Sequence, residues 1–213
     1  MRIAGIDEAG KGPVIGPMCI GGVLTEEDKL HSINNLGVAD SKKLSPSRRE
    51  DLALKIEKYA LKIFVLEISP SQIDELRRIM TMNEIMVVGF SKVLENLQPD
   101  TAYVDAADVK AERFGKKLTE NYTQNVSKPI TIVSEHKADD KYPIVSAASI
   151  IAKVTRDRRV AELRKKIGID FGSGYPSDKK TKDFLENWVQ EYGSLPDFVR
   201  HSWKTAKKCL KNK

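Results

Sequence analysis

The sequence predicts an α/β fold, with alternating strands and helices over residues 1–167 and a helical C-terminal part over residues 168–213. Three observations indicate this. Segments of strand and helix character alternate through the first part. Two Ser-Pro pairs mark the beginnings of helices within it. A glycine-rich stretch at 168–178 then ends the alternation, and only helical patterns follow. We expect the C-terminal part to pack on the core.

Five segments have the composition of strands. The first is a short apolar run that ends in carboxylates, and the second contains glycines. The third, LKIFVLEI at 61–68, shows the alternation typical of a strand with one buried face. The five predicted strands are 2–7, 18–24, 61–68, 101–106 and 129–134.

Helices are predicted between and after these strands. Ser45 precedes Pro46, so that a capping side chain stands before a proline at the first helical position, and an amphipathic run continues to about residue 60. Ser69 repeats this start, and Gln72 completes a capping box. The other predicted helices, from apolar spacing and from the order of the elements, are 82–97, 109–122, 143–167, 179–192 and 201–211.

The composition is that of a globular protein. Hydrophobic residues make up 40% and charged residues 31% of the 213 residues, a balance typical of folded chains. No apolar run approaches the ~20 residues that a membrane helix needs, and no signal peptide precedes the first strand. We therefore expect a soluble, cytoplasmic protein, and a monomer, because no coiled-coil stripe appears. Cys19 and Cys209 lie far apart, which argues against a disulfide framework and against zinc.

Positive charge is concentrated in the last third of the chain. Residues 1–136 have a net charge of −2, whereas residues 137–213 have a net charge of +8. A basic C-terminal third suggests an anionic partner, of which nucleic acid is the commonest. A lysine-rich helix surface that only faces solvent explains the same charge equally well.

Carboxylates lie at the ends of three predicted strands. Asp7 and Glu8 end the first, Asp105 ends the fourth, and Asp139 and Asp140 follow the fifth. Sites in α/β sheets form at the carboxyl ends of strands, so these acids are expected to meet at one place. Clustered carboxylates repel one another unless a cation lies between them. The alternative is that such acids cap the following helices or face water.

The chemistry of these side chains points to a hard divalent cation. Mg²⁺ prefers oxygen ligands and combines a few carboxylates with substrate phosphate. No cysteine and no histidine pair accompanies the acids, which argues against zinc and for Mg²⁺ or Mn²⁺. Two such ions ~3.5–4 Å apart can hold the attacking and the leaving oxygen of a phosphodiester.

A glycine loop follows the first predicted strand. The run from Gly5 to Gly12 nearly matches a nucleotide-binding phosphate loop, but Gly12 replaces the required Ser or Thr, which argues against an NTPase. Glycines can instead let the backbone approach a substrate, or they can form a plain turn. Further on, Lys42 and Lys43 could hold phosphates, although adjacent lysines are also common on surfaces.

The chain closely resembles ribonuclease HII, the type 2 ribonuclease H family, and is most similar to its single-chain archaeal-type members. The resemblance spans most of the chain and rests on five motifs in family order: GIDEAGKGPVIGP (5–17), ADSKKL (39–44), AYVDAADV (102–109), EHKADDKYPIVSAASIIAKVTRD (135–157) and FGSGYPSD (171–178). It implies an RNase H-like mixed sheet flanked by helices, with a helical C-terminal part that binds substrate.

The resemblance also implies an activity. The family hydrolyses the RNA strand of RNA/DNA hybrids, and it cuts on the 5′ side of single ribonucleotides in duplex DNA. Two-metal-ion catalysis with Mg²⁺ or Mn²⁺ leaves 3′-hydroxyl and 5′-phosphate ends. Such an activity belongs to DNA replication and DNA repair. The expected partners are therefore RNA/DNA hybrids and ribonucleotide-containing DNA duplexes, and not a membrane.

The resemblance assigns roles to individual residues. The catalytic and metal-binding acids are Asp7, Glu8, Asp105 and Asp139. Asp139 is chosen over Asp140 because it directly follows the pair Lys137-Ala138. The expected substrate-binding residues are Gly10, Lys11, Gly12, Lys42, Lys43 and Tyr175. Many family members have Arg at the position of Lys11, which puts only the contacts of that side chain in doubt. Tyr175 is expected to stack near the RNA–DNA junction, or else to anchor the packing of its loop.

Other residues have structural interpretations. The small residues at 146–152 predict a helix that packs closely on the sheet, and no base partner is apparent for a nucleophilic serine. His136 is interpreted as structural, with a proton shuttle as the alternative. Trp188 and Trp203 are expected to anchor the core of the C-terminal part. A non-catalytic nucleic-acid-binding module remains the alternative function, since it needs the basic part of the chain but not the carboxylates.

Overall fold

The structure is a computed structural model that describes residues 1–38 and 44–211. Lys42 and Lys43 lie outside the described residues. The chain falls into two compact units. Unit 1 contains Met1–Ala9, Cys19–Leu66 and Met82–Thr155, and unit 2 contains Gly10–Met18, Glu67–Thr81 and Arg156–Lys213. The sequence predicted two consecutive parts, residues 1–167 and residues 168–213, whereas each of these units is built from three separate stretches of the chain. The division at residue 167 stays a prediction.

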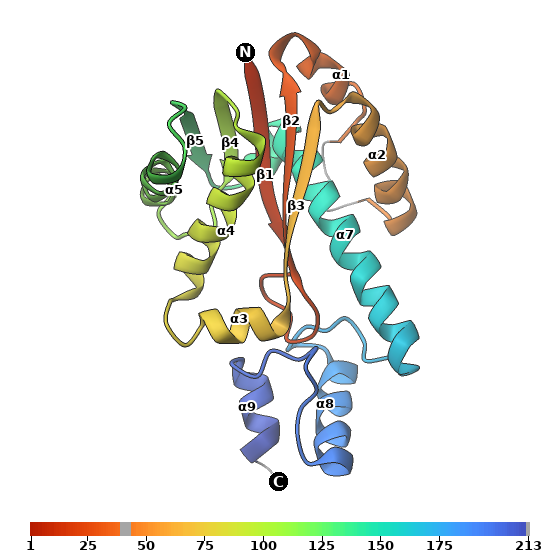
Figure 1. The fold of residues 1–213 in the computed structure, drawn as a ribbon. Coiled ribbons are helices and arrows are strands. Elements are labelled where there is room, and N and C mark those ends of the chain that lie inside the picture. Colours follow the sequence, from red (N-terminus) through yellow and green to blue (C-terminus); the bar gives the residue numbers. More distant parts are fainter. Residues whose placement is uncertain (39–43, 212–213) are drawn as a thin grey trace. The chain divides into compact units, whose positions relative to one another are not determined.

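One mixed sheet of five strands organises the fold (Figure 1). Its order is β3-β2-β1-β4-β5, so the N-terminal strand is central. β1 pairs antiparallel with β2 and parallel with β4, and β4 pairs parallel with β5. All five predicted strands are present, as β1 Arg2–Ala9, β2 Met18–Glu26, β3 Lys62–Ile68, β4 Thr101–Asp105 and β5 Thr131–Glu135. The predicted α/β class with a mixed sheet is confirmed.

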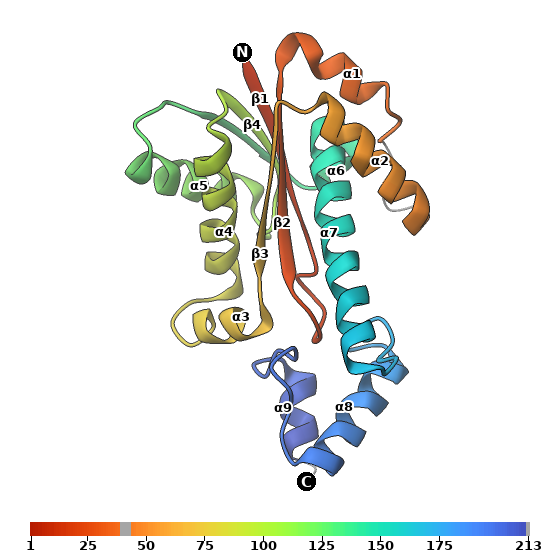
Figure 2. The ribbon, with the colours of Figure 1, turned by 45° about the vertical axis from the view of Figure 1, so that its right-hand side comes forward.

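Helices cover both faces of the sheet in unit 1 (Figure 2). Gly21 and Gly22 of β2 show this, because consecutive strand residues face opposite sides. A Cβ atom at Gly22 would lie 2.4 Å from Val93 of helix α4 (Met82–Leu97). A Cβ atom at Gly21 would lie 2.7 Å from the carbonyl oxygen of Ala148, in helix α7 (Pro143–Ile167). The expected close packing of the small-residue stretch on the sheet is thus confirmed.

Two further helices of unit 1 complete these layers. α5 (Ala111–Asn125) packs beside α4, where the rings of Phe90 and Phe114 meet edge to face with centroids 5.2 Å apart. α2 (Pro46–Tyr59) contributes Leu52, Ala53 and Ile56 to the buried cluster that contains the first half of α7. Burying a leucine or isoleucine side chain such as Leu52 or Ile56 stabilises the fold by ~1.5–3 kcal/mol.

The predicted helix starts are confirmed. Ser45 caps α2 by accepting a hydrogen bond from the backbone N–H of Arg48 at 3.2 Å. Ser69 and Gln72 form the predicted capping box at the start of α3 (Pro70–Leu76). These side chains accept hydrogen bonds from backbone donors that a helix leaves without an internal partner.

Three short helices were not predicted. They are η1 (Glu27–Lys29), α1 (Leu30–Asn34) and α6 (Ala138–Lys141). Segments of three to five residues are too short for a 3.6-residue period to be recognised. α6 begins after Lys137, whose φ of 56° lies in the left-handed region, which a lysine rarely adopts.

The C-terminal helices belong to unit 2. α8 (Lys179–Tyr192) and α9 (Lys204–Lys211) surround an apolar cluster that includes Phe171, Phe184 and Leu185. Trp188 packs against this cluster with its ring centroid 5.5 Å from that of Phe184, which confirms its expected role as a packing anchor. Every helix in residues 1–38 and 44–211 is too short or too polar to cross a lipid bilayer.

Asp108 holds the loop between β4 and α5. Its carboxylate is nearly inaccessible and accepts two hydrogen bonds from the half-exposed Arg113 guanidinium. This contact, together with the backbone N–H of Lys110, lowers the pKa of Asp108 to about 2. A lowered carboxyl pKa means that the stabilisation is present above the ordinary pKa of an unfolded aspartate and disappears as the pH falls towards 2.

Replacing Asp108 with asparagine should therefore destabilise the protein by about 1 kcal/mol at neutral pH. The difference from the wild type should vanish as the pH approaches 2. Thermal unfolding at a series of pH values measures both effects. Asp51→Asn, at an exposed position of α2, is the control and should change stability little. A pH-independent loss in Asp108→Asn would contradict the assignment to the charged pair.

Candidate active site

Two neighbouring strands bring Asp7 and Asp105 together in unit 1. The last residues paired between β1 and β4 are Ile6 and Val104, and Asp7 and Asp105 come directly after this pair in their strands. Asp7 is only 5% exposed, and its side chain lies on the face of β1 that is covered by α7, where Ser149 is its neighbour. The two carboxylates therefore lie at the shared end of parallel strands, as parallel pairing requires.

The environment of Asp7 opposes a negative charge. Burial raises the pKa of the Asp7 carboxyl well above its ordinary value, and the charges of Glu8 and Asp105 raise it further. Two contacts act in the other direction, namely the Ser149 hydroxyl and the backbone N–H of Glu8, which donates to Asp7 Oδ1 at 2.7 Å. Burial and repulsion outweigh these stabilising contacts, so the negative charge of the ionised Asp7 carboxylate is not compensated by the side chains around it.

Asp105 connects this pair to α6. Its Oδ1 atom accepts a hydrogen bond from the backbone N–H of Ala138 at 2.9 Å, which fixes the start of α6 beside the end of β4. Within α6, Asp139 is 5% exposed, whereas Asp140 is exposed. Asp139 and Asp140, the two candidate acids in this segment, thus have different environments. Only Asp139 is buried, directly after Ala138, whose N–H binds Asp105.

His136 has a structural contact in this region. Its Nε2 atom donates to the carbonyl oxygen of Val109 at 3.1 Å, which ties the turn after β5 to the loop after β4. The contact agrees with the structural interpretation of this histidine.

The oxygen-only composition of these acids fits a hard divalent ion. A cation would offset the repulsion that raises the pKa of Asp7. Over residues 1–38 and 44–211, no three His, Cys, Asp or Glu side chains converge closely enough to form a ready set of ligands. Like charges keep apart without a counterion, and Asp105 is engaged by the Ala138 N–H.

The glycine loop after β1 belongs to unit 2. Gly10 has φ of +81°, and the chain continues from this loop into β2 and not into a helix. A phosphate loop requires a helix at this point, so the NTPase interpretation is not supported. The backbone N–H groups of Val14 and Ile15 donate to the carbonyl oxygen of Gly174, at 2.8 and 3.3 Å.

This link places Tyr175 next to the loop. A Cβ atom at Gly12 would lie 3.5 Å from the Tyr175 ring. The guanidinium of Arg156 lies over the same ring, 5.6 Å from its centroid, and the Arg156 side chain also contacts the position that a Cβ atom of Gly10 would take. Unit 2 therefore brings together Gly10, Gly12 and Tyr175, three of the residues expected to bind substrate.

The segment that carries Tyr175 is held by the start of α8. Asp178 caps α8 through the backbone N–H of Lys180 at 2.9 Å, and it also accepts from the N–H of Ser173 at 2.6 Å. Thr181 accepts from the N–H of Gly174 at 3.0 Å and donates to the carbonyl of Phe171. The glycine-rich stretch is thus a fixed loop with Tyr175 exposed at its surface.

Three side chains around the glycine loop were missed in the sequence. They are the side chains of Arg156, Arg200 and Trp203. Trp203 was expected only as a packing anchor, and its hydrogen bond to the loop was not predicted. Arg156 lies within one of the family motifs, and that position was the available signal. Arg200 and Trp203 lie 188 or more residues from the loop positions Gly10 to Gly12. No local pattern reveals such a contact.

Replacing Gly10 with alanine should destabilise the protein by about 1–3 kcal/mol. The new Cβ atom would lie 2.7 Å from the carbonyl oxygen of Pro17 and 2.9 Å from Cδ of Arg156, at a positive φ. Gly168→Ala is a matched control, because Gly168 has φ of +69° and open space around it. Urea unfolding of both variants separates the steric contact from the backbone strain. Equal losses would show that the contact contributes nothing.

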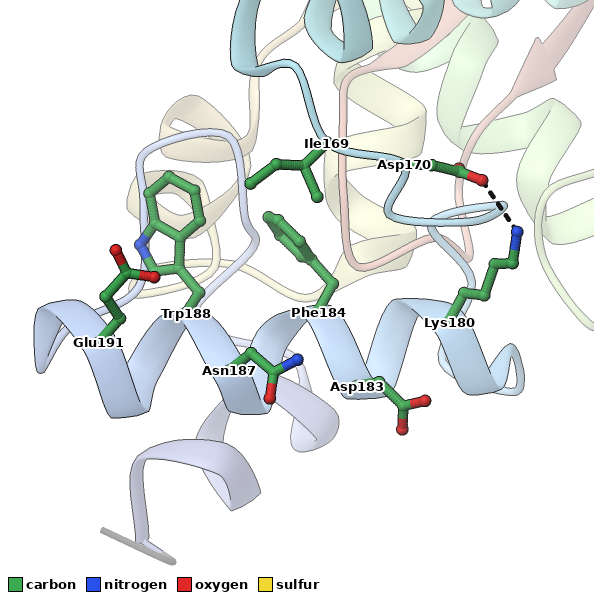
Figure 3. A pocket seen from close by; sticks show the side chains of 8 residues that line it. All are labelled: Ile169, Asp170, Lys180, Asp183, Phe184, Asn187, Trp188 and Glu191. Carbon is green, nitrogen blue, oxygen red and sulfur yellow. Dashed lines mark hydrogen bonds and ion pairs between the residues drawn. The ribbon is translucent and has the colours of Figure 1, made fainter.

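A pocket of about 350 Å³ in unit 2 contains none of the expected site residues. It has an apolar wall of Ile169, Phe184 and Trp188 (Figure 3). Three carboxylates surround this wall, and one of them, Asp170, pairs with Lys180 at 2.9 Å. Because carboxylates repel phosphate, this pocket does not suit a nucleic acid backbone.

Comparison with known proteins identifies the family. A family model described as ribonuclease HII matches residues 4–206. The chain belongs to the ribonuclease HII family. A ribonuclease HII from Methanococcoides burtonii is 62% identical over 213 residues, which cover 99% of this chain and 100% of that protein. A ribonuclease HII from Pyrococcus abyssi is 50% identical over 98% of this chain and 91% of that protein.

Solved structures confirm the RNase H-like fold. The ribonuclease H2 from Pyrococcus horikoshii OT3 has a TM-score of 0.93 and 45% identity, over 100% of this chain and 98% of that one. A chain of the PCNA:RNase HII complex from Archaeoglobus fulgidus has a TM-score of 0.86 and 47% identity, over 96% of both chains. The chain is thus a metal-dependent ribonuclease, an endonuclease, of a family with activity on RNA/DNA hybrids.

Proposed function

We propose that this ribonuclease HII family member cuts the RNA strand of hybrids and also cuts DNA duplexes on the 5′ side of a single ribonucleotide, leaving 3′-hydroxyl and 5′-phosphate ends. The observation that carries the proposal is the carboxylate pair formed by the buried Asp7 of β1 and the half-buried Asp105 at the end of β4. Burial and the charges of Glu8 and Asp105 raise the pKa of Asp7, so an ionised carboxylate at this position carries an electrostatic cost. Such a cost is characteristic of sites that bind a cation and act on a charged substrate.

Asp7, Glu8, Asp105 and Asp139 would hold the metal, as Mg²⁺ or Mn²⁺. The burial of Asp139 and the exposure of Asp140 support the choice between these neighbours. When bound, two divalent ions would supply Lewis-acid stabilisation of charge on the attacking and leaving oxygens. The Glu8 N–H, which donates to Oδ1 at 2.7 Å, holds the Asp7 carboxylate in one orientation. The Ala138 N–H does the same for Asp105.

Gly10, Lys11 and Gly12 would recognise the ribose through backbone N–H groups. The 2′-hydroxyl is the group that distinguishes RNA from DNA, and glycines let the backbone approach it closely. Lys11 replaces the arginine of many family members, so backbone recognition carries more of the interaction here. Tyr175 lies beside Gly12 with its ring exposed, which supports stacking on the neighbouring sugar.

Phosphate contacts would come from Lys42, Lys43 and the basic C-terminal third. The net charge of +8 over residues 137–213 supports this, and binding should weaken as the salt concentration rises. The monomeric state, the cytoplasmic location and a role in DNA replication or repair stay predictions from the sequence.

The decisive experiment compares a labelled DNA duplex that carries one ribonucleotide with the same duplex made only of DNA. With Mg²⁺ or Mn²⁺, we expect one nick on the 5′ side of the ribonucleotide and no cut in the control. EDTA should abolish the nick and leave the protein folded. Binding without any cut, with either metal and also on an RNA/DNA hybrid, would instead favour a non-catalytic nucleic-acid-binding module.

A further inference from the structure

Two side chains hold every carbonyl oxygen of the Gly10–Lys11–Gly12 tripeptide. Arg200 donates from Nη2 to the carbonyl of Gly10 at 2.6 Å and from Nη1 to the carbonyl of Lys11 at 2.9 Å. Trp203 donates from Nε1 to the carbonyl of Gly12 at 3.0 Å. We call Arg200 and Trp203 the carbonyl clamp. All of these residues belong to unit 2.

The clamp is rigid for three reasons. Arg200 is fully buried, and its guanidinium lies over the Trp203 ring at 4.8 Å from the centroid. Arg200 also donates to the carbonyl of Gly16 from Nε and Nη2, at 3.2 and 3.0 Å. A planar guanidinium engaged at three points has one orientation, so the tripeptide carbonyls that it binds are fixed as well.

The backbone that carries the clamp is itself anchored. The carboxylate of Asp74, in α3, accepts from the backbone N–H of His201 at 2.7 Å and from that of Ser202 at 2.9 Å. The N–H of Arg200 donates to the carbonyl of Val14 at 2.8 Å. The residues between the two clamp side chains therefore cannot shift without breaking buried or charge-assisted hydrogen bonds.

Peptide geometry gives this arrangement a consequence for recognition. In a trans peptide the C=O and N–H bonds point in opposite directions. When the carbonyls of Gly10 and Lys11 are held on one side, the N–H groups of Lys11 and Gly12 are presented on the other. We propose that Arg200 and Trp203 are positioning residues that orient these two N–H groups for the ribose 2′-hydroxyl. This inference rests on the proposed function of the tripeptide.

A clamp that only stabilised the loop would look the same in the structure but would behave differently in an assay. Loss of stability lowers the fraction of active enzyme and affects every duplex equally. Loss of positioning reduces the advantage of a duplex with a 2′-hydroxyl over one without it. The distinguishing measurement is therefore selectivity and not total activity.

The test uses Trp203→Phe, which keeps a ring over Arg200 and removes the indole N–H donor to Gly12. Arg200→Lys is the second variant, because it keeps the charge and loses the planar fork. The matched control is Trp188→Phe, a half-buried tryptophan of the same unit that packs on Phe184 and Phe198. Three constants are measured in Mg²⁺. They are the single-turnover cleavage rate and the KM for the duplex with one ribonucleotide, and the Ki of the all-DNA duplex as competitor.

We expect Trp203→Phe to lower the ratio of rate to KM about threefold to tenfold, the effect of one lost hydrogen bond, and to leave the Ki unchanged. Arg200→Lys should lower the ratio of rate to KM further. Trp188→Phe should change neither this ratio nor the Ki of the all-DNA duplex. A ratio in Trp203→Phe within about twofold of the control, or a Ki that rises in parallel, would overturn the inference. If the wild type fails to cut the ribonucleotide duplex, the proposed function fails instead. Should Arg200→Lys not fold, Trp203→Phe alone decides.

Discussion

Replacing Asp7 with asparagine should lower the cleavage of a ribonucleotide-containing duplex by about 10³-fold or more. The substitution keeps the shape of the side chain and removes the charge that would hold a cation between Asp7 and Asp105. Single-turnover assays with excess enzyme measure the loss. Asp140→Asn is the matched control, because this neighbouring acid of α6 is exposed, and it should cost at most a few-fold. Comparable losses in both variants would contradict the assignment.

The same variant should be more stable than the wild type when no divalent metal is present. Burial and the charges of Glu8 and Asp105 raise the pKa of Asp7, so the folded protein holds this proton more tightly than the unfolded chain does. The wild type therefore loses stability as the pH rises above the ordinary carboxyl range, and Asp7→Asn does not. Thermal unfolding in EDTA should show a gain for Asp7→Asn that grows from acidic to neutral pH. A loss of stability at neutral pH would show that the carboxylate is structural.

Replacing Gly12 with alanine should lower the ratio kcat/KM for the ribonucleotide duplex by about 10²-fold. The added methyl group would lie 3.5 Å from the Tyr175 ring, an ordinary contact that the fold tolerates. It would fill the space beside the ring where the sugar is expected to approach the backbone. The variant should therefore melt within a few degrees of the wild type and lose activity.

The control for Gly12→Ala is the Ki of the all-DNA duplex, which should change little because phosphate contacts remain. Activity close to that of the wild type would show that the sugar does not approach this position. Weaker binding of both duplexes would show that the methyl group disturbs the phosphate contacts instead.

Local patterns were sufficient to predict most of the fold. The alternation that predicts β3 and the Ser-Pro pairs that predict the starts of α2 and α3 can be recognised from consecutive residues. The structure contains this strand and both helices. The short α6 was not predicted, because it depends on the left-handed turn at Lys137, a residue that does not favour this conformation. Because neighbouring residues of a helix point to different sides, Asp139 of α6 is buried and Asp140 is exposed, a distinction that depends on this short helix.

The candidate site was predictable only in part. Acids at strand ends mark Asp7, Glu8 and Asp105, because parallel pairing brings strand ends together. The clamp of Arg200 and Trp203 depends instead on contacts between residues that are 189 to 191 positions apart in the chain. Arg200 looks like one more cation in a basic region, and nothing in its neighbourhood shows that it is fully buried.

The long span between the tripeptide and its clamp has a consequence for synthesis of the protein. Translation produces residues 10–12 well before Arg200 and Trp203, which lie 189 to 191 residues further along the chain from their carbonyl partners. Domains form progressively from the N-terminus during synthesis, so β1 and its acids can exist while the clamp is still to be made. A nascent chain on the ribosome would thus carry its carboxylates long before it could orient a ribose. On the proposed function, ribonucleotide selection would be acquired only when the segment that carries Arg200 and Trp203 has left the ribosome and has closed on the loop that was made earlier.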